Sequence, residues 1–171
     1  RVDLVVQAFN KLKLPLYVVG DGPERVFIDR LAGPNVHILG RKSQVEVAQL
    51  MSCCRAFVYA GVEDFGIAPV EAMASGAPVI AFAKGGLLDT VRCVSQGLTS
   101  PNGLLFPDQT ITSLIEAVNW FEERRLWHTL SSESIRLWAE RFRPEAFAMK
   151  FEKVLCKAWT NHEKDCAISS S

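Results

Sequence analysis

The chain has 171 residues, of which 49% are hydrophobic, and its 19 basic and 19 acidic residues cancel to a formal net charge of zero. A chain of that length forms one domain with a sizeable core. Because the chain has no excess of positive charge, neither nucleic acid nor an acidic membrane is expected as a partner. No apolar run approaches the roughly 20 residues of a membrane span, so no transmembrane segment is expected.

Apolar runs alternate with helical patterns along the chain. It opens on an amphipathic helical pattern, with Val2, Val5, Val6 and Phe9 on one stripe, so the strand that should precede this helix is absent. Strands are predicted at residues 16–20, 36–40, 56–60, 78–82 and 103–106. Helices are predicted between them at residues 24–31, 43–53, 69–75, 87–91 and 111–124. This alternation predicts a Rossmann-like α/β fold, in which helices flank a parallel sheet.

Short patterns refine this assignment. Ser43 followed by Glu46 has the spacing of a capping box at a helix start. Residues 126–160 are expected to form two further helices, broken around Arg143 and Pro144. We therefore expect one domain over residues 1–160 and a polar tail over residues 161–171.

The five cysteines are odd in number and contain no Cys-x-x-Cys pair, which indicates reduced thiols in an intracellular compartment. The three histidines are scattered, and none has the spacing of a metal ligand relative to a cysteine. No metal is therefore expected.

Residues 62–81 place two carboxylates, Glu63 and Glu71, around a strand-to-helix turn. Pro69 suits the first position of the helix, and Gly76 with Pro78 ends it about two turns later. Glu71 is then expected in the first turn, beside the free N–H groups near Gly66 and Ile67. Taken alone, such a pair is also typical of an ordinary helix-start carboxylate and a solvated loop residue.

The residues around this turn carry a family resemblance. Glu63 and Glu71, with seven residues between them that include Phe65-Gly66, and with Ala72 to Ala81 after them, resemble the signature of the retaining GT-B glycosyltransferases of family 4. Gly85-Gly86 followed by Asp89 is similar to that family's Gly-Gly-x-x-Glu element, with Asp in place of Glu. Residues 20–24, which follow the apolar run 16–19, are similar to the family's second strand-turn-helix unit, and residues 103–107 are similar to its closing strand. The resemblance covers residues 1–125.

The resemblance implies the C-terminal, donor-binding half of a GT-B fold with its first strand missing. It implies that Glu71 binds the ribose hydroxyls, that Glu63 contacts the transferred sugar in the catalytic step, and that the backbone near Phe65, Gly66 and Ile67 binds sugar or phosphate oxygens. The remaining residues that it places at the donor are Val70 and, around the base, Gly40, Arg41 and Lys42.

The function implied is transfer of a hexose from a nucleotide sugar to a saccharide or lipid-linked acceptor. The sequence 63–71 and the segment 82–86 resemble mannosyltransferases that build surface polysaccharides, which points to GDP-mannose as the donor, with no cofactor and no metal. The acceptor would bind a domain that this chain lacks, so the chain alone is expected to be inactive. The whole protein is expected in the cytoplasm, peripheral at the inner face of the membrane.

Three alternatives compete with this interpretation. One is a catalytically inactive sugar-nucleotide-binding or interaction module that keeps the fold. Another is a sugar-nucleotide epimerase, against which the Glu63 and Glu71 pair argues. A dinucleotide-binding fingerprint at Gly20-x-Gly22 is disfavoured, because Arg25 stands where a third glycine is needed.

Overall fold

The structure is a computed structural model that describes residues 1–168, with side chains over residues 1–160. The strands are β1 (Leu16–Val19), β2 (Val36–Gly40), β3 (Phe57–Tyr59), β4 (Val79–Phe82) and β5 (Gly103–Phe106). The α-helices are α1 (Val2–Leu12), α2 (Arg25–Leu31), α3 (Gln44–Cys53), α4 (Ile67–Ala74), α5 (Leu87–Thr90), α6 (Ile111–Glu123), α7 (Leu126–Thr129), α8 (Ser132–Ala139) and α9 (Pro144–Ile168). Each of the five predicted strands is present within a residue or two of its expected position.

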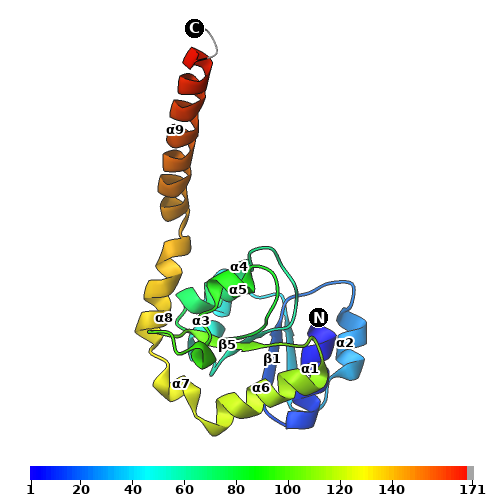
Figure 1. Ribbon diagram of the computed structural model, residues 1–171. Coiled ribbons are helices and arrows are strands. Elements are labelled where there is room, and N and C mark those ends of the chain that lie inside the picture. The colour runs from blue at the N-terminus through cyan, green and yellow to red at the C-terminus, as the bar shows by residue number, and fades with distance from the viewer. Residues whose placement is uncertain (169–171) are drawn as a thin grey trace.

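All strand pairs are parallel, but they form two sheets where one was expected. The first sheet pairs β1 with β2, and the second has the order β3-β4-β5. Helices cover the sheets, as the alternation of strands and helices predicted, and Figure 1 shows them around the strands. The α/β class is therefore confirmed, and the correction concerns the number of sheets.

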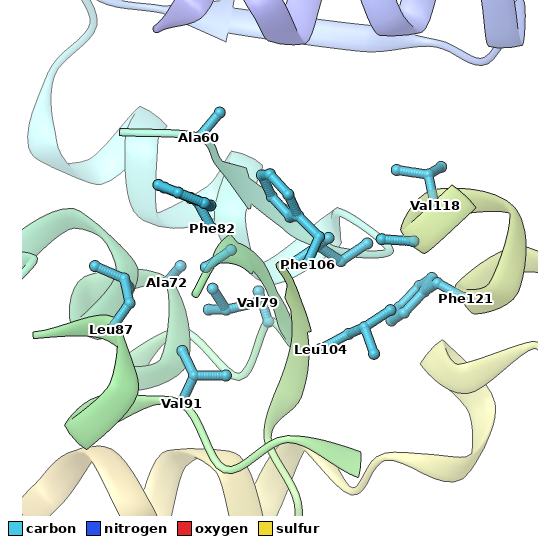
Figure 2. Packing of buried hydrophobic residues seen from close by; sticks show 14 of the residues in the cluster. Ala60, Ala72, Val79, Phe82, Leu87, Val91, Leu104, Phe106, Val118 and Phe121 are labelled. Carbon is cyan, nitrogen blue, oxygen red and sulfur yellow. The ribbon is translucent and has the colours of Figure 1, made fainter. Parts of the chain in front are cut away.

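The core is centred on β4, the middle strand of the second sheet. Val79, Ile80, Ala81 and Phe82 are all buried, because neighbouring strands flank β4 and helices cover it. Figure 2 shows side chains from α4, β5 and α6 packed around this strand, among them Phe106 and Phe121. Each large side chain buried in this way contributes roughly 1.5–3 kcal/mol.

The predicted capping box at the start of α3 is confirmed. The Ser43 side chain accepts from the backbone N–H of Glu46 at 3.3 Å, and the Glu46 carboxylate accepts from the backbone N–H of Ser43 at 2.9 Å. The Ser43 hydroxyl also donates to the Glu46 carboxylate, at 2.8 Å. The bonds that this carboxylate accepts from the Ser43 N–H and hydroxyl, together with that from Lys42, lower the pKa of Glu46 to about 2. The box thus fixes where the chain turns from β2 into α3.

The start of α4 differs from the prediction. The helix begins at Ile67 with Gly66 as its N-cap, so Pro69 is its third residue and Glu71 lies beyond the first turn. Pro69 remains compatible with this position, because the N–H groups of the first turn have no partner in the helix. The expectation that Glu71 lies in the first turn is therefore wrong. The helix dipole acts on charges in the first turn, so it does not stabilise the Glu71 carboxylate.

The end of α4 agrees with the prediction. Gly76 has a φ of +90°, and its N–H donates to Met73 O at 2.8 Å. The next N–H, from Ala77, donates to Ala72 O at 3.0 Å. These two bonds form a Schellman motif, which requires the left-handed backbone that glycine adopts readily.

The C-terminal region is helical, with a break at Arg143 between a 3-10 turn and α9. Figure 1 shows α9 extending away from the sheets. Residues 161–168, which we assigned to a polar tail, continue this helix, and residues 169–171 lie outside the described residues. Among the helices described, none has the length and apolar character required to cross a membrane.

Candidate functional site

The candidate site is built from the loops that follow the strands. In open parallel sheets, ligands bind in the crevice beyond the carboxyl ends of the strands. The Glu63 loop connects β3 to α4, and the Gly85-Gly86 loop connects β4 to α5. Since β3 and β4 are parallel neighbours, both loops leave the same edge of the sheet.

The loop that carries Glu63 rests directly on the glycine pair after β4. The Gly86 N–H donates to Glu63 O at 2.9 Å. A β-carbon added to Gly85 would lie 2.3 Å from Glu63 O, and one added to Gly86 would lie 2.3 Å from Asp64 O and 2.6 Å from the Cα of Phe65. No side chain larger than hydrogen fits between these backbones, so the glycines set the position of the loop.

The side chain of Glu63 is held by Tyr59, the last residue of β3. The Tyr59 hydroxyl donates to the exposed Glu63 carboxylate. Burial raises the pKa of Tyr59, and the hydrogen bond to the Glu63 anion raises it further. Tyr59 therefore stays protonated as a donor at neutral pH, which keeps the carboxylate in a fixed orientation.

A left-handed glycine separates this loop from α4. Gly66 has a φ of +84°, and a β-carbon there would lie 3.3 Å from Leu87 Cδ2. The N–H groups of Ile67 and Ala68, in the first turn, point out of the helix start without an intrahelical partner. Phe65, 45% exposed, packs edge-on against Phe142 with 5.7 Å between ring centroids. A ligand at the loop would meet backbone donors at the start of the helix.

Glu71 lies on the wall of a cleft with a volume of about 820 Å³. The cleft separates β1 from β3, and its lining includes Glu71 but not Glu63. Within residues 1–160, no hydrogen bond or ion pair engages the exposed Glu71 carboxylate. Val70, next to it, is half-buried and packs against the core. The structure thus attaches the two carboxylates to one loop-helix unit but does not line one pocket with both.

Gly40, Arg41 and Lys42 follow β2 in the first sheet. Gly40 has a φ of +67°, and its carbonyl accepts from the N–H of Gly20 at 2.9 Å. The Lys42 ammonium lies 3.2 Å from the Glu46 carboxylate, so it supports the capping box. The Arg41 side chain is exposed. These residues occupy the carboxyl end of β2, as the sequence predicted, on the far side of β1 from the Glu63 loop.

Two residues that sequence reasoning missed hold the site together. Tyr59 orients Glu63, and Gln109 donates through Nε2 to Ala60 O at 2.8 Å, which ties the end of β5 to the end of β3. The Gln109 side-chain oxygen lies 3.5 Å from a guanidinium nitrogen of Arg1. The sequence did contain a signal for the first contact, because Tyr59 ends a predicted strand four residues before Glu63. The contact between Gln109 and Ala60 spans 49 residues, so no local pattern indicated it.

The other titratable side chains that the structure describes indicate no second catalytic or metal centre. No group of three or more His, Cys, Asp or Glu side chains in the described part of the chain could hold a metal ion. Cys53, Cys54, Cys93 and Cys156 are free thiols, and burial raises the pKa of Cys54 to about 11. The side chain of Cys166 lies outside those described.

Known proteins resemble this chain in sequence. The family described as glycosyl transferases group 1 matches residues 1–136. An uncharacterized glycosyltransferase of Methanocaldococcus jannaschii is 32% identical over 162 residues, which cover 90% of this chain and 43% of that protein. The N-acetyl-alpha-D-glucosaminyl L-malate synthase of Bacillus anthracis is 29% identical over 163 residues, covering 90% and 41%. The chain thus spans less than half the length of these relatives.

Solved structures share the fold. Sucrose-phosphate synthase from Thermosynechococcus elongatus has a TM-score of 0.74 at 24% identity, covering 94% of this chain and 42% of that one. Anabaena HepE, in complex with UDP and glucose, has a TM-score of 0.68 at 22% identity, covering 91% and 43%.

Proposed function

This chain belongs to the glycosyl transferases group 1 family, and on that premise we propose that it is the donor-binding half of a retaining glycosyltransferase that uses a nucleotide sugar. One observation carries the proposal. The Glu63 loop is seated on Gly85 and Gly86, its carboxylate is oriented by Tyr59, and it ends at a helix start with free N–H groups. A loop fixed so closely can hold a reacting sugar in one position.

The chemistry of glycosyl transfer matches these groups. The anomeric carbon gains positive charge in the transition state, while the departing diphosphate gains negative charge. Glu63 would accept hydrogen bonds from hydroxyls of the transferred sugar and bear a negative charge near the cationic centre. The N–H groups from Phe65 to Ile67 would bind sugar or phosphate oxygens. Same-face attack by the acceptor would retain the configuration.

Glu71 is proposed to bind the ribose. An ionised carboxylate only accepts hydrogen bonds, and its two oxygens can receive two neighbouring hydroxyls. The Glu71 side chain is exposed on the wall of the cleft and keeps its accepting capacity free of other described side chains. Val70 would position this helix turn, and the backbone of Gly40, Arg41 and Lys42 would meet the base.

We propose GDP-mannose as the donor, on the sequence of the Glu63–Glu71 segment and of residues 82–86. UDP-glucose is the competing donor, because the Anabaena HepE structures contain UDP, glucose or UDP-glucose. The acceptor, a glycan or a lipid-linked saccharide, would bind the part of the polypeptide outside residues 1–171. The protein would work in the cytoplasm, at the inner face of the membrane, without a metal or cofactor.

Calorimetry on the complete polypeptide that contains residues 1–171 tests this proposal. Glu71→Gln replaces charge-assisted hydrogen bonds to the ribose with neutral ones, so nucleotide affinity should fall by about 1 kcal/mol or more, roughly fivefold. Glu123→Gln, on the exposed end of α6, is the matched control and should change nothing. Unchanged affinity of Glu71→Gln for GDP, UDP and ADP would remove Glu71 from the donor site.

A further inference from the structure

Three aromatic rings lie in a row between the Glu63 loop and the C-terminal helices. Phe65, in the loop, packs edge-on against Phe142, with 5.7 Å between the ring centroids and 71° between the ring planes. Phe142 packs in the same way against Trp138, at 6.3 Å and 74°. Edge-to-face pairs at these distances are a favoured arrangement of aromatic side chains. This aromatic row joins the candidate site to α8 and to the 3-10 turn Glu140–Phe142, which precedes α9.

Trp138 anchors the far end of the aromatic row. Its indole N–H donates to Thr90 O at 2.8 Å. The guanidinium carbons of Arg92 and Arg141 lie 4.7 Å and 4.0 Å from the centroid of its ring, which is within the range of cation–π attraction. Because the ring is also half-buried, these three contacts restrict its rotation. Phe142 therefore packs against a side chain that is itself held in place.

The anchor of the row and the support of the loop belong to the same short helix. Gly86, which contacts the backbone of the loop, is the N-cap of α5, and Thr90 is the last residue of α5. Leu87 and Thr90 are almost completely buried, so α5 is fixed in the core. The loop is thus connected to α5 twice, directly through Gly86 and indirectly through the aromatic row.

The glycine pair after β4 limits how closely the loop can approach α5, but a steric fit does not hold the loop there. Along residues 62–65 the only backbone hydrogen bond within the described chain is the one from Gly86 N–H to Glu63 O. The packing of Phe65 on Phe142 adds an attractive contact, and such a contact opposes departure of the loop. Phe142 therefore contributes to the position of the loop from outside it.

We propose that Phe142 is a positioning residue for the donor. Through Phe65 it holds the backbone N–H groups of Phe65, Gly66 and Ile67 where they bind oxygens of the sugar or diphosphate. This inference rests on the proposed function. In that function the loop binds the sugar and the diphosphate, whereas Glu71 binds the ribose. Phe142 therefore acts on the binding and transfer of the complete donor and not on the binding of a nucleoside monophosphate.

Donor kinetics on the complete polypeptide test this role. Phe142→Ala should lower kcat/KM for GDP-mannose about threefold to tenfold, the range expected for one edge-to-face pair. The inhibition constant of GMP should stay unchanged, because GMP lacks the sugar and the second phosphate. Phe142→Tyr keeps the ring and should keep the activity. Leu137→Ala, which shortens a 67% exposed apolar side chain of α8, is the matched control and should change neither quantity.

A double-mutant cycle shows whether Phe142 acts through Phe65. The aromatic row is already broken in Phe65→Ala, so adding Phe142→Ala to that variant should cause no further decrease in kcat/KM. Decreases that multiply would overturn the proposal, because Phe142 would then act independently of the loop. A weakening of GMP inhibition equal to the decrease in kcat/KM would overturn it as well.

Two further measurements keep the outcomes separate. If Phe142→Ala does not fold, Phe142→Leu takes its place in the cycle, because leucine fills much of the space without a ring. If the unmodified protein prefers UDP-glucose, the same measurements use UDP-glucose and UMP. Consumption of no donor by the unmodified protein would refute the proposed function and this inference with it, whereas normal turnover with multiplying decreases would refute the inference alone.

Discussion

Tyr59 donates its hydroxyl hydrogen to the carboxylate of Glu63, so the last residue of β3 orients the acid in the loop that follows it. The two residues are four apart in sequence, and their side chains turn back toward each other over Gly61. A β-carbon added at Gly61 would lie 2.9 Å from the Tyr59 hydroxyl oxygen, so the tyrosine occupies the space above this glycine.

Removing that hydroxyl should affect turnover and spare nucleotide binding. Tyr59→Phe frees Glu63 to rotate into water, so kcat should fall about fivefold to tenfold, close to 1 kcal/mol, with the Kd for the nucleotide unchanged. Glu63→Ala should lower kcat further, because the carboxylate itself is lost. Steady-state kinetics with calorimetry measure both quantities, and Glu123→Gln, at the exposed end of α6, is the control. Equal losses in kcat and affinity would contradict the proposed contact with the sugar.

A single methyl group on the glycine pair should displace the Glu63 loop. Gly86 has an ordinary φ of −62°, so the cost of Gly86→Ala is steric, from a contact of 2.3 Å with Asp64 O. We expect a loss of about 1–3 kcal/mol, which lowers Tm by roughly 2–4 °C per kcal/mol. Gly22→Ala, with nothing within 4 Å of the added carbon, is the control. Similar Tm values for the two variants in calorimetric scans would show that the Glu63 loop moves aside at little energetic cost.

The capping box makes a pH-dependent contribution to stability. The pKa of Glu46 is about 2 in the folded chain against an ordinary 4.5, so folding favours the ionised form. This contribution is fully present above about pH 4.5 and is lost as the pH falls toward 2. Ser43→Ala removes the hydroxyl and should raise the pKa of Glu46 in a carboxyl NMR titration. An unchanged pKa of Glu46 in Ser43→Ala would show that the Ser43 side chain does not stabilise the ionised carboxylate.

Asn102 should be among the most sensitive polar positions. Its side chain is fully buried, accepts from Arg92 N–H at 2.8 Å and donates to Thr90 O at 3.1 Å. Asn102→Ala leaves the Arg92 N–H without its acceptor, at a cost of about 2–3 kcal/mol in denaturant unfolding. Asn119→Ala, on the exposed face of α6, should be close to neutral.

Trp138 shares an acceptor with Asn102, so the two positions should interact. Its indole N–H donates to Thr90 O at 2.8 Å. Combining Trp138→Phe with Asn102→Ala should cost more than the sum of the single changes, because the carbonyl then loses both donors. Additive losses of stability in the double-mutant cycle would show that water replaces the two donors at Thr90 O.

Donor preference distinguishes the nucleotide-sugar assignments. The complete polypeptide, offered GDP-mannose, UDP-glucose and ADP-glucose with a saccharide acceptor, should consume GDP-mannose fastest. A site that hydrogen-bonds one base or hydroxyl pattern rejects others strongly, since the wrong donor leaves buried polar groups unpaired. Preference for UDP-glucose would overturn the mannosyl assignment and leave glycosyl transfer standing, whereas consumption of none would remove both.

Local patterns predicted the elements well, and long-range contacts account for the differences. The five apolar runs predicted five strands, and Ser43 with Glu46 predicted a capping box, because these signals depend on neighbouring residues. The helix start was misplaced because Pro69 suggested the first position, whereas Gly66, packed against Leu87, turns the chain two residues earlier. The division into two sheets and the Gln109 contact depend on segments far apart in sequence, so no local pattern contained them.

Gly85 and Gly86 impose a constraint that extends beyond this one chain. Their hydrogens face the backbone of residues 63–65, so the fit depends on the path of that loop and not on its side chains. Substitutions at Asp64 or Phe65 therefore leave the requirement for both glycines unchanged. An insertion or deletion in the loop changes its path, so the close contact that requires glycine at positions 85 and 86 is lost. Among homologues, loop length and the glycine pair should be inherited together, and a lineage that lengthens the loop should be the one in which alanine or serine replaces glycine.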